Sequence, residues 1–157
     1  MIKPYRNGPL GALMDEYERA TQELKTVLKI INQNDFIKIV DPSTKDPDCR
    51  SIQTIINHVV RSGYGYSNYI RKQFGDKWIE RKDNYKINSP EIACDQLNKM
   101  LRYTSETFDN KWDLSLDNIA NTKIITTWGQ TYDVEQLLEH AIVHILRHRR
   151  QIEQFRM

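Results

Sequence analysis

Three of the chain's four histidines are spaced four residues apart near its C-terminal end, at His140, His144 and His148. Residues four apart lie one turn apart on the same side of an α-helix, so the three imidazoles are predicted to form a ladder. Neighbouring imidazoles at this spacing can share one metal ion, as two histidines at i and i+4 do in zinc-binding helices. The spacing therefore predicts a metal site. The alternative is a helix whose histidines serve only packing and solvation.

The apolar residues around the ladder predict which histidines face the core. Residues 133–155 read as one helix, and counting about 100° per residue from Val134 gathers its apolar side chains in one stripe. His148 falls at about 320°, inside the stripe, His144 at about 280°, at its edge, and His140 at about 240°, toward solvent. A metal ion held between packed helices would therefore take His144 and His148 rather than His140 and His144.

The fourth histidine, His58, is predicted to lie on a second long helix. Ser51 is a preferred N-cap residue and Gly75 is a preferred helix stop, which together delimit a helix over residues 51–74. The apolar residues of this segment recur at helical spacing, and His58 flanks the stripe that they form. The two helices could therefore bring His58 to the ladder.

Small and aromatic residues follow that histidine along its helix. Ser62, Gly65 and Tyr69 lie on nearly the same side as the histidine, whereas Tyr66 falls in the core stripe. We take Ser62, Tyr66 and Tyr69 as candidate substrate-pocket residues, although packing alone would also explain Tyr66. Gly63 and Gly65 each cost about 1 kcal/mol of helix propensity relative to alanine. Close helix packing and space for a substrate are both open as explanations of the two glycines.

The periodicity of the whole chain predicts an all-α fold. Apolar residues at steps of three and four indicate four amphipathic helices, over residues 10–32, 51–74, 89–109 and 133–155. Turn signals make 33–50 a long connection, and 75–88 reads as a surface connection. The β-branched segment 111–132 predicts a short extended piece or a hairpin before the last helix. Two of these links are too long for a minimal up-and-down bundle, so we expect a four-helix bundle with long connections and a crossover or an added short element.

The length and the net charge of the chain limit the number of domains and the kinds of partner that it can have. The chain of 157 residues is long enough for one domain, which we expect to span residues 1–157. Its net charge of +2 arises from 23 basic and 21 acidic residues, which argues against nucleic acid or an anionic membrane as the partner. The one basic cluster, Arg147, Arg149 and Arg150, could attract an anionic co-substrate or simply compensate the dipole of a helix end.

The chain's ends and cysteines predict a cytoplasmic location. The first ten residues contain no apolar signal region, and no apolar run reaches membrane-spanning length. Cys49 and Cys94 are isolated and form no CxxC pair, so both are expected to be ordinary thiols in a reducing compartment.

Three stretches of the sequence resemble the DinB-like (YfiT-type) superfamily: SIQTIINH at 51–58, TTWGQTYDVEQLLEH at 126–140 and HILRHRRQI at 144–152. The resemblance implies a cytoplasmic four-helix bundle, often a homodimer, that holds a divalent metal ion, zinc or nickel, on three histidines. Carried over, these ligands are His58, His144 and His148, and His140 remains an alternative ligand in another register. Some relatives are metal-dependent thiol transferases that use low-molecular-weight thiols.

The leading functional hypothesis is a metal-dependent enzyme. Three neutral imidazoles bind Zn²⁺ at about 2.0–2.1 Å and leave one position open for a thiolate or a water molecule. Such a site suits transfer of a thiol to a small molecule or hydrolysis of one. No carboxylate is a good general base, because Glu139 lies at about 140° and points away from the ladder. The alternative is a non-catalytic dimerisation or partner-binding module with structural metal or none.

The hypothesis makes a geometric prediction. If His58, His144 and His148 share one ion, their helices must be antiparallel neighbours, and the ligating nitrogen atoms must lie within about 3–4 Å of one another. His140 should then lie at the rim of the site. The Trp128–Gly129 segment enters the last helix at its far end and is not expected to cover the metal.

Overall fold

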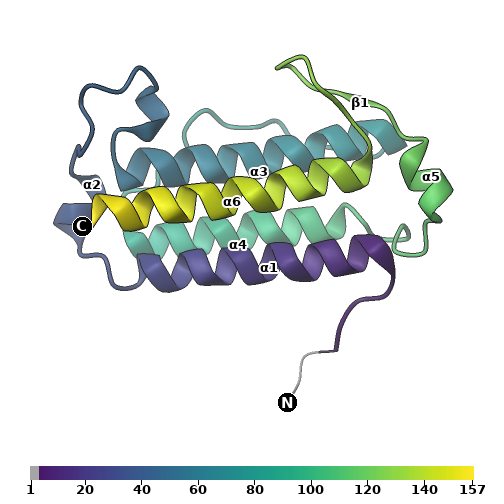
Figure 1. Cartoon of the computed structure of the whole chain (residues 1–157), viewed down its shortest axis with the longest axis horizontal. Coiled ribbons are helices and arrows are strands. Elements are labelled where there is room, and N and C mark those ends of the chain that lie inside the picture. Colours follow the sequence, from purple (N-terminus) through teal and green to yellow (C-terminus); the bar gives the residue numbers. More distant parts are fainter. Residues whose placement is uncertain (1–3) are drawn as a thin grey trace.

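The computed structural model describes residues 4–157 as a bundle of helices (Figure 1). Within these residues the four long helices are α1 (Gly8–Leu28), α3 (Ile52–Phe74), α4 (Pro90–Glu106) and α6 (Val134–Phe155). Helix α3 packs between α4 and α6, and α1 closes the bundle by packing against the same two helices. The predicted all-α, four-helix architecture is confirmed. None of the described helices is both long and apolar enough to cross a membrane.

Burial of the predicted stripes sets the rotation of each helix about its own axis. On α6 the buried side chains are those of the predicted stripe: Val134, Leu137, Leu138, Ala141, Ile145 and Ile152. Each large aliphatic side chain contributes about 1.5–3 kcal/mol when it is fully buried. This gain holds α6 in the rotation that turns His144 and His148 toward α3.

The predicted caps delimit the two helices that carry histidines. The Ser51 side chain accepts a hydrogen bond from the backbone N–H of Thr54, and the Thr54 side chain returns one, which completes a capping box at the start of α3. Gly75 ends α3 with a φ of 72°, a left-handed conformation that glycine adopts without strain. Asp133 and Gln136 form a second capping box at the start of α6.

The crossover of the bundle lies in the connection between α3 and α4. Residues 75–89 run back along α3, because three α3 side chains donate hydrogen bonds to successive backbone carbonyls of this segment: Asn68 to Ile79, Asn57 to Asp83 and Gln53 to Ile87. Helix α4 therefore starts at the same end of the bundle as α3 and runs parallel to it (Figure 1). The two links that are too long for a minimal bundle, from α1 to α3 and from α4 to α6, contain short added elements rather than a crossover.

These short elements include a confirmed hairpin. Strand β1 (Ile124–Ile125) pairs antiparallel with β2 (Thr131–Tyr132), immediately before α6. Two other additions, α2 (Gln33–Ile37) and the 3-10 helix η1 (Pro47–Cys49), lie in the link between α1 and α3.

Two predicted helix ends and one predicted segment were wrong. The first helix ends at Leu28 rather than residue 32, because the Asn32 side chain accepts a hydrogen bond from Asp35 N and starts α2 instead. The third helix ends at Glu106 rather than residue 109, shortly before Asn110 takes a left-handed φ of 62°. The segment expected to be extended also contains helix α5 (Leu116–Ala120).

Candidate metal centre

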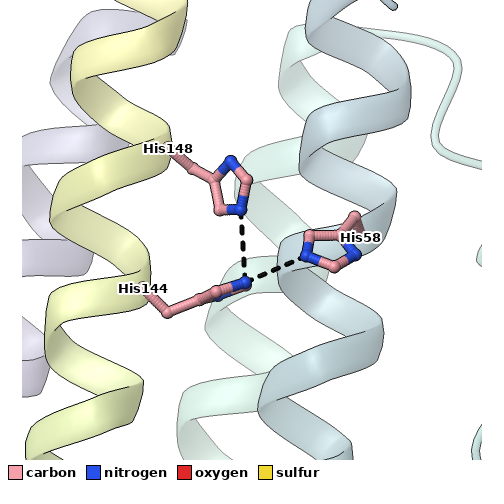
Figure 2. Close-up of side chains that lie close together, drawn as sticks. All are labelled: His58, His144 and His148. Atoms are coloured by element: carbon pink, nitrogen blue, oxygen red, sulfur yellow. Dashed lines mark hydrogen bonds between the residues drawn. The ribbon is translucent and has the colours of Figure 1, made fainter. Parts of the chain in front are cut away.

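Side chains from α3 and α6 bring three imidazoles to one point (Figure 2). The Nε2 atom of His144 lies 2.9 Å from Nε2 of His58 and 3.2 Å from Nε2 of His148. Each of the three histidines offers a ring nitrogen, and these atoms all lie within 4.8 Å of one another. Three nitrogen ligands of a tetrahedral zinc ion are separated by about 3.4 Å. The His58, His144 and His148 group, hereafter the histidine triad, therefore has nearly the spacing that one ion requires.

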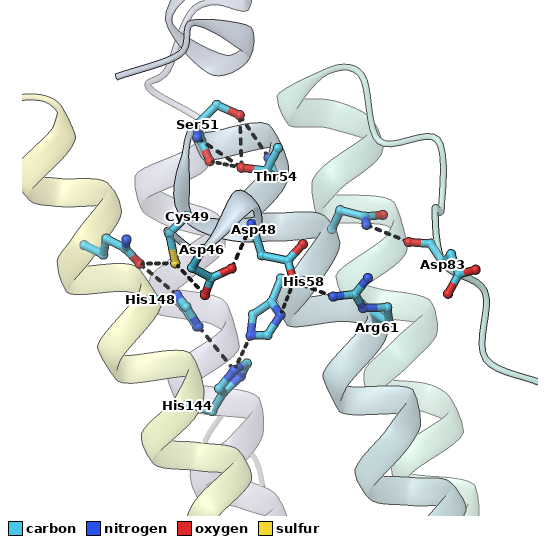
Figure 3. Close-up of polar contacts among 12 residues, drawn as sticks. Asp46, Asp48, Cys49, Ser51, Thr54, His58, Arg61, Asp83, His144 and His148 are labelled. Atoms are coloured by element: carbon cyan, nitrogen blue, oxygen red, sulfur yellow. Dashed lines mark hydrogen bonds and ion pairs between the residues drawn. The ribbon is translucent and has the colours of Figure 1, made fainter. Parts of the chain in front are cut away.

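Two of the three imidazoles are anchored through their other ring nitrogen (Figure 3). His58 Nδ1 lies 3.1 Å from Oδ2 of Asp48, a carboxylate that also forms an ion pair with Arg61. His148 Nδ1 lies 3.0 Å from Oε1 of Gln151. Both oxygen atoms accept hydrogen bonds, so each Nδ1 carries the proton and each Nε2 keeps its lone pair. Metal-ligating histidines are commonly oriented by such outer contacts.

The donor set of the histidine triad fits a cation. With the protons of His58 and His148 on Nδ1, both Nε2 atoms are acceptors, and the single Nε2 of His144 can donate one proton to only one of them. At least one of the two short nitrogen–nitrogen contacts therefore sets lone pair against lone pair. With the proton of His144 on Nδ1 as well, all three Nε2 atoms would offer lone pairs, and a divalent cation among them would replace this repulsion with coordination.

Burial keeps all three imidazoles neutral. Burial, together with the neighbouring His148 and His58 rings, lowers the pKa of His144 to about 2. Burial also lowers the pKa of His58, against an opposing effect of the Asp48 carboxylate. The pKa of His148 is lowered by burial as well, against the hydrogen bond to Gln151. The neutral imidazole is the form that binds a metal ion, so the triad is in that form at neutral pH.

His140 lies outside the histidine triad. Its ring stacks on that of Trp128, with centroids 5.6 Å apart, and its Nδ1 lies 3.3 Å from the Tyr132 hydroxyl. Its ring centroid is 6.4 Å from that of His144. The structure thus places His140 at the rim, one turn from the triad, among the aromatic residues of the hairpin.

Two hollows meet at the triad. The first, hereafter the aromatic pocket, has a volume of about 380 Å³. Its lining includes two triad histidines, His58 and His144, together with Ser62, Tyr66, Tyr69, Arg81 and Trp128. The second, the polar pocket, has a volume of about 580 Å³ and is lined by all three triad histidines and, among others, by Cys49, Arg147, Arg150 and Gln151. A ligand in either hollow can reach the triad. All three candidate pocket residues thus share the aromatic pocket, and Trp128 lies nearer to the site than the sequence suggested.

Sequence reasoning missed the two anchoring residues. Gln151 follows His148 by three positions on the same helix, and this spacing could have identified it. Asp48 belongs to η1, and its turn sequence carries no sign that the segment folds over α3.

Cys49 lies beside Asp48, with Sγ 3.9 Å from Gln151 Oε1. Burial raises the pKa of the Cys49 thiol. Glu139 is exposed, as its angle on the helix indicated.

The chain is similar to a known protein family and to a solved structure. A family model described as the DinB family matches residues 8–154. Among solved structures, the chain is similar to the crystal structure of a mycothiol-dependent maleylpyruvate isomerase, with a TM-score of 0.58 and 14% sequence identity. The similarity covers 96% of this chain but only 63% of that one, and at this identity it concerns the fold. No curated protein matches the chain.

Proposed function

This chain belongs to the DinB family, and on that premise we propose that it is a metal-dependent enzyme whose histidine triad holds one divalent cation, zinc or nickel. Its reaction is the transfer of a thiol to a small molecule, with hydrolysis as the second version. The thiol version is favoured because the structurally similar isomerase depends on mycothiol. The co-substrate would accordingly be a low-molecular-weight thiol.

One observation carries the proposal: the Nε2 atoms of three imidazoles meet at one place, and Asp48 and Gln151 hold two of the rings in the required tautomer. A divalent cation bound there would lower the pKa of a thiol or a water molecule at its open position and keep it nucleophilic near neutral pH. Asp48 would keep the proton of His58 on Nδ1. The aromatic and polar pockets would bind the reactants on either side of the triad.

The alternative, a non-catalytic module with a structural metal, is less well supported. Structural zinc sites usually use four protein ligands. Among residues 4–157, three histidines form the only group with metal-binding spacing. Two pockets also open onto this group, and a structural site has no use for them.

The test begins with elemental analysis of protein purified without an affinity tag. We expect one zinc or nickel ion per chain, and loss of that ion in His58→Ala. His140→Ala is the matched control, because it removes the remaining imidazole of the same ladder and should keep the metal. Stoichiometric metal in His58→Ala would eliminate the triad as its holder. A screen of thiols and electrophiles, with metal present and removed, then tests the reaction.

A further inference from the structure

The aromatic pocket contains a cation that has no ion-pair partner within the described residues. Arg81 lies in the connection that runs back along α3 and lines the pocket together with His58 and His144. Within residues 4–157 its guanidinium has neither an ion pair nor a hydrogen bond. The other pocket guanidinium, that of Arg61, is already paired with Asp48. Arg81 is therefore the uncommitted positive charge beside the histidine triad.

A glycine on α3 provides the space for this charge. A Cβ atom on Gly65 would lie 3.1 Å from Nη1 of Arg81, which is closer than an ordinary contact. Gly63 serves a different purpose, because a Cβ atom there would lie only 2.1 Å from Sδ of Met100 on α4. Close helix packing thus explains Gly63, whereas at Gly65 the Arg81 side chain fills the space that a Cβ atom would need.

Flat aromatic side chains also line this pocket. The ring centroid of Trp128 lies 6.2 Å from that of Tyr66 and 5.9 Å from that of Tyr69, both nearly perpendicular. The Tyr69 hydroxyl donates to Thr127 Oγ1 at 3.1 Å and accepts from Thr127 N at 2.8 Å, which fixes the hairpin tip that carries Trp128. Burial raises the pKa of Tyr66 to about 12, so its hydroxyl stays protonated and can donate a hydrogen bond.

From this geometry we propose that the aromatic pocket binds a planar, unsaturated carboxylate and that Arg81 is the residue that binds the carboxylate group. The fork of a guanidinium matches the two oxygen atoms of a carboxylate. The rings of Tyr66, Tyr69 and Trp128 offer flat apolar surface to the unsaturated part. A volume of about 380 Å³ suits a small molecule. A cationic ligand is disfavoured, because the Arg81 guanidinium in the pocket has no ion-pair partner among the described residues.

The proposal rests on the proposed function, because it makes this carboxylate the substrate that is presented to the triad. Asp83 also lines the pocket and contributes a negative charge to this region. It forms no ion pair with Arg81, so the guanidinium remains free to bind an anion.

Benzoate and benzamide are suitable probes, because they have the same ring and nearly the same shape and differ in charge. Isothermal titration of the full chain as purified should show benzoate binding at least about 10-fold more tightly than benzamide, the usual advantage of hydrogen bonds to a charged group. Arg81→Gln should abolish this preference. Lys82→Gln removes the same charge one residue away, outside the lining of the pocket, and should leave the preference unchanged. Gly65→Ala should reduce benzoate affinity, because its methyl group displaces Nη1 of Arg81.

Equal affinity for benzoate and benzamide, or no binding of either, would overturn the carboxylate site. Equal losses in Arg81→Gln and Lys82→Gln would also overturn it, by showing a general charge effect. Repeating the titration after chelation separates this proposal from the metal site, with far-UV circular dichroism to verify the fold. Benzoate binding that needs the metal but not Arg81 would refute the carboxylate site and support the triad. A preference that needs Arg81 in protein that never binds metal would support the carboxylate site and refute the proposed function.

Discussion

Replacing Asp48 by asparagine should weaken metal binding without removing a metal ligand. The Asp48 carboxylate accepts the Nδ1 proton of His58 at 3.1 Å, and the two side chains are only 28% and 25% exposed. An asparagine oxygen can still accept this proton, but without the charge that makes the imidazole more basic. A hydrogen bond to a charged group contributes about 1.5–3 kcal/mol, against about 0.5–1.5 kcal/mol for a neutral one. The difference of about 1–1.5 kcal/mol corresponds to an affinity roughly 10-fold lower.

The assay is a competition titration with a chelating dye, which reports the dissociation constant of the bound metal. Asp83→Asn is the matched control, because it makes the same charge change in the aromatic pocket, away from any contact with a triad ring. We expect its affinity to remain within about twofold of the wild-type value, since exposed charges contribute little. An Asp48→Asn affinity equal to the wild-type value, or an equal loss in Asp83→Asn, would show that this hydrogen bond does not support the site.

Two further predictions concern stability. The metal-free protein should lose stability as the pH falls below about 6.5. In the unfolded state His144 then binds a proton, whereas in the folded state burial lowers its pKa to about 2 and the ring stays neutral. His144→Gln should flatten this decline by up to about 1.4 kcal/mol per pH unit in urea unfolding curves, and an unchanged slope would contradict the burial argument. Gly63→Ala should lower the free energy of unfolding by about 1–3 kcal/mol, since its methyl group would overlap Met100. A stability gain, as helix propensity alone predicts, would show that α3 and α4 separate easily.

Much of the fold could be predicted because its signals are local. The apolar stripes determine which face of each long helix is buried, and the capping residues Ser51, Gly75 and Asp133 mark where α3 and α6 start or end. The five-residue helices α2 and α5 are too short to show a periodic pattern, so they were missed. The crossover depends on hydrogen bonds between α3 and residues 75–89, which no local pattern reveals.

In the candidate site, too, the features set by local sequence signals could be predicted, and those set by packing between distant segments could not. The rotation of α6 favoured His144 and His148 over His140, because the apolar stripe that sets this rotation can be read from the sequence. The meeting of these rings with His58 depends on how α3 and α6 pack. The anchoring role of Asp48 depends on how η1 folds over α3. The choice between zinc and nickel, the homodimer and the cytoplasmic location remain predictions.

The most direct test of the central claim is an anomalous difference map from crystals of the protein as purified, recorded above and below the absorption edge of the metal found by elemental analysis. We expect one strong peak about 2.0–2.1 Å from Nε2 of His58, His144 and His148, with no fourth protein ligand. A peak at other residues, or a site closed by a fourth side chain such as Cys49, would contradict it.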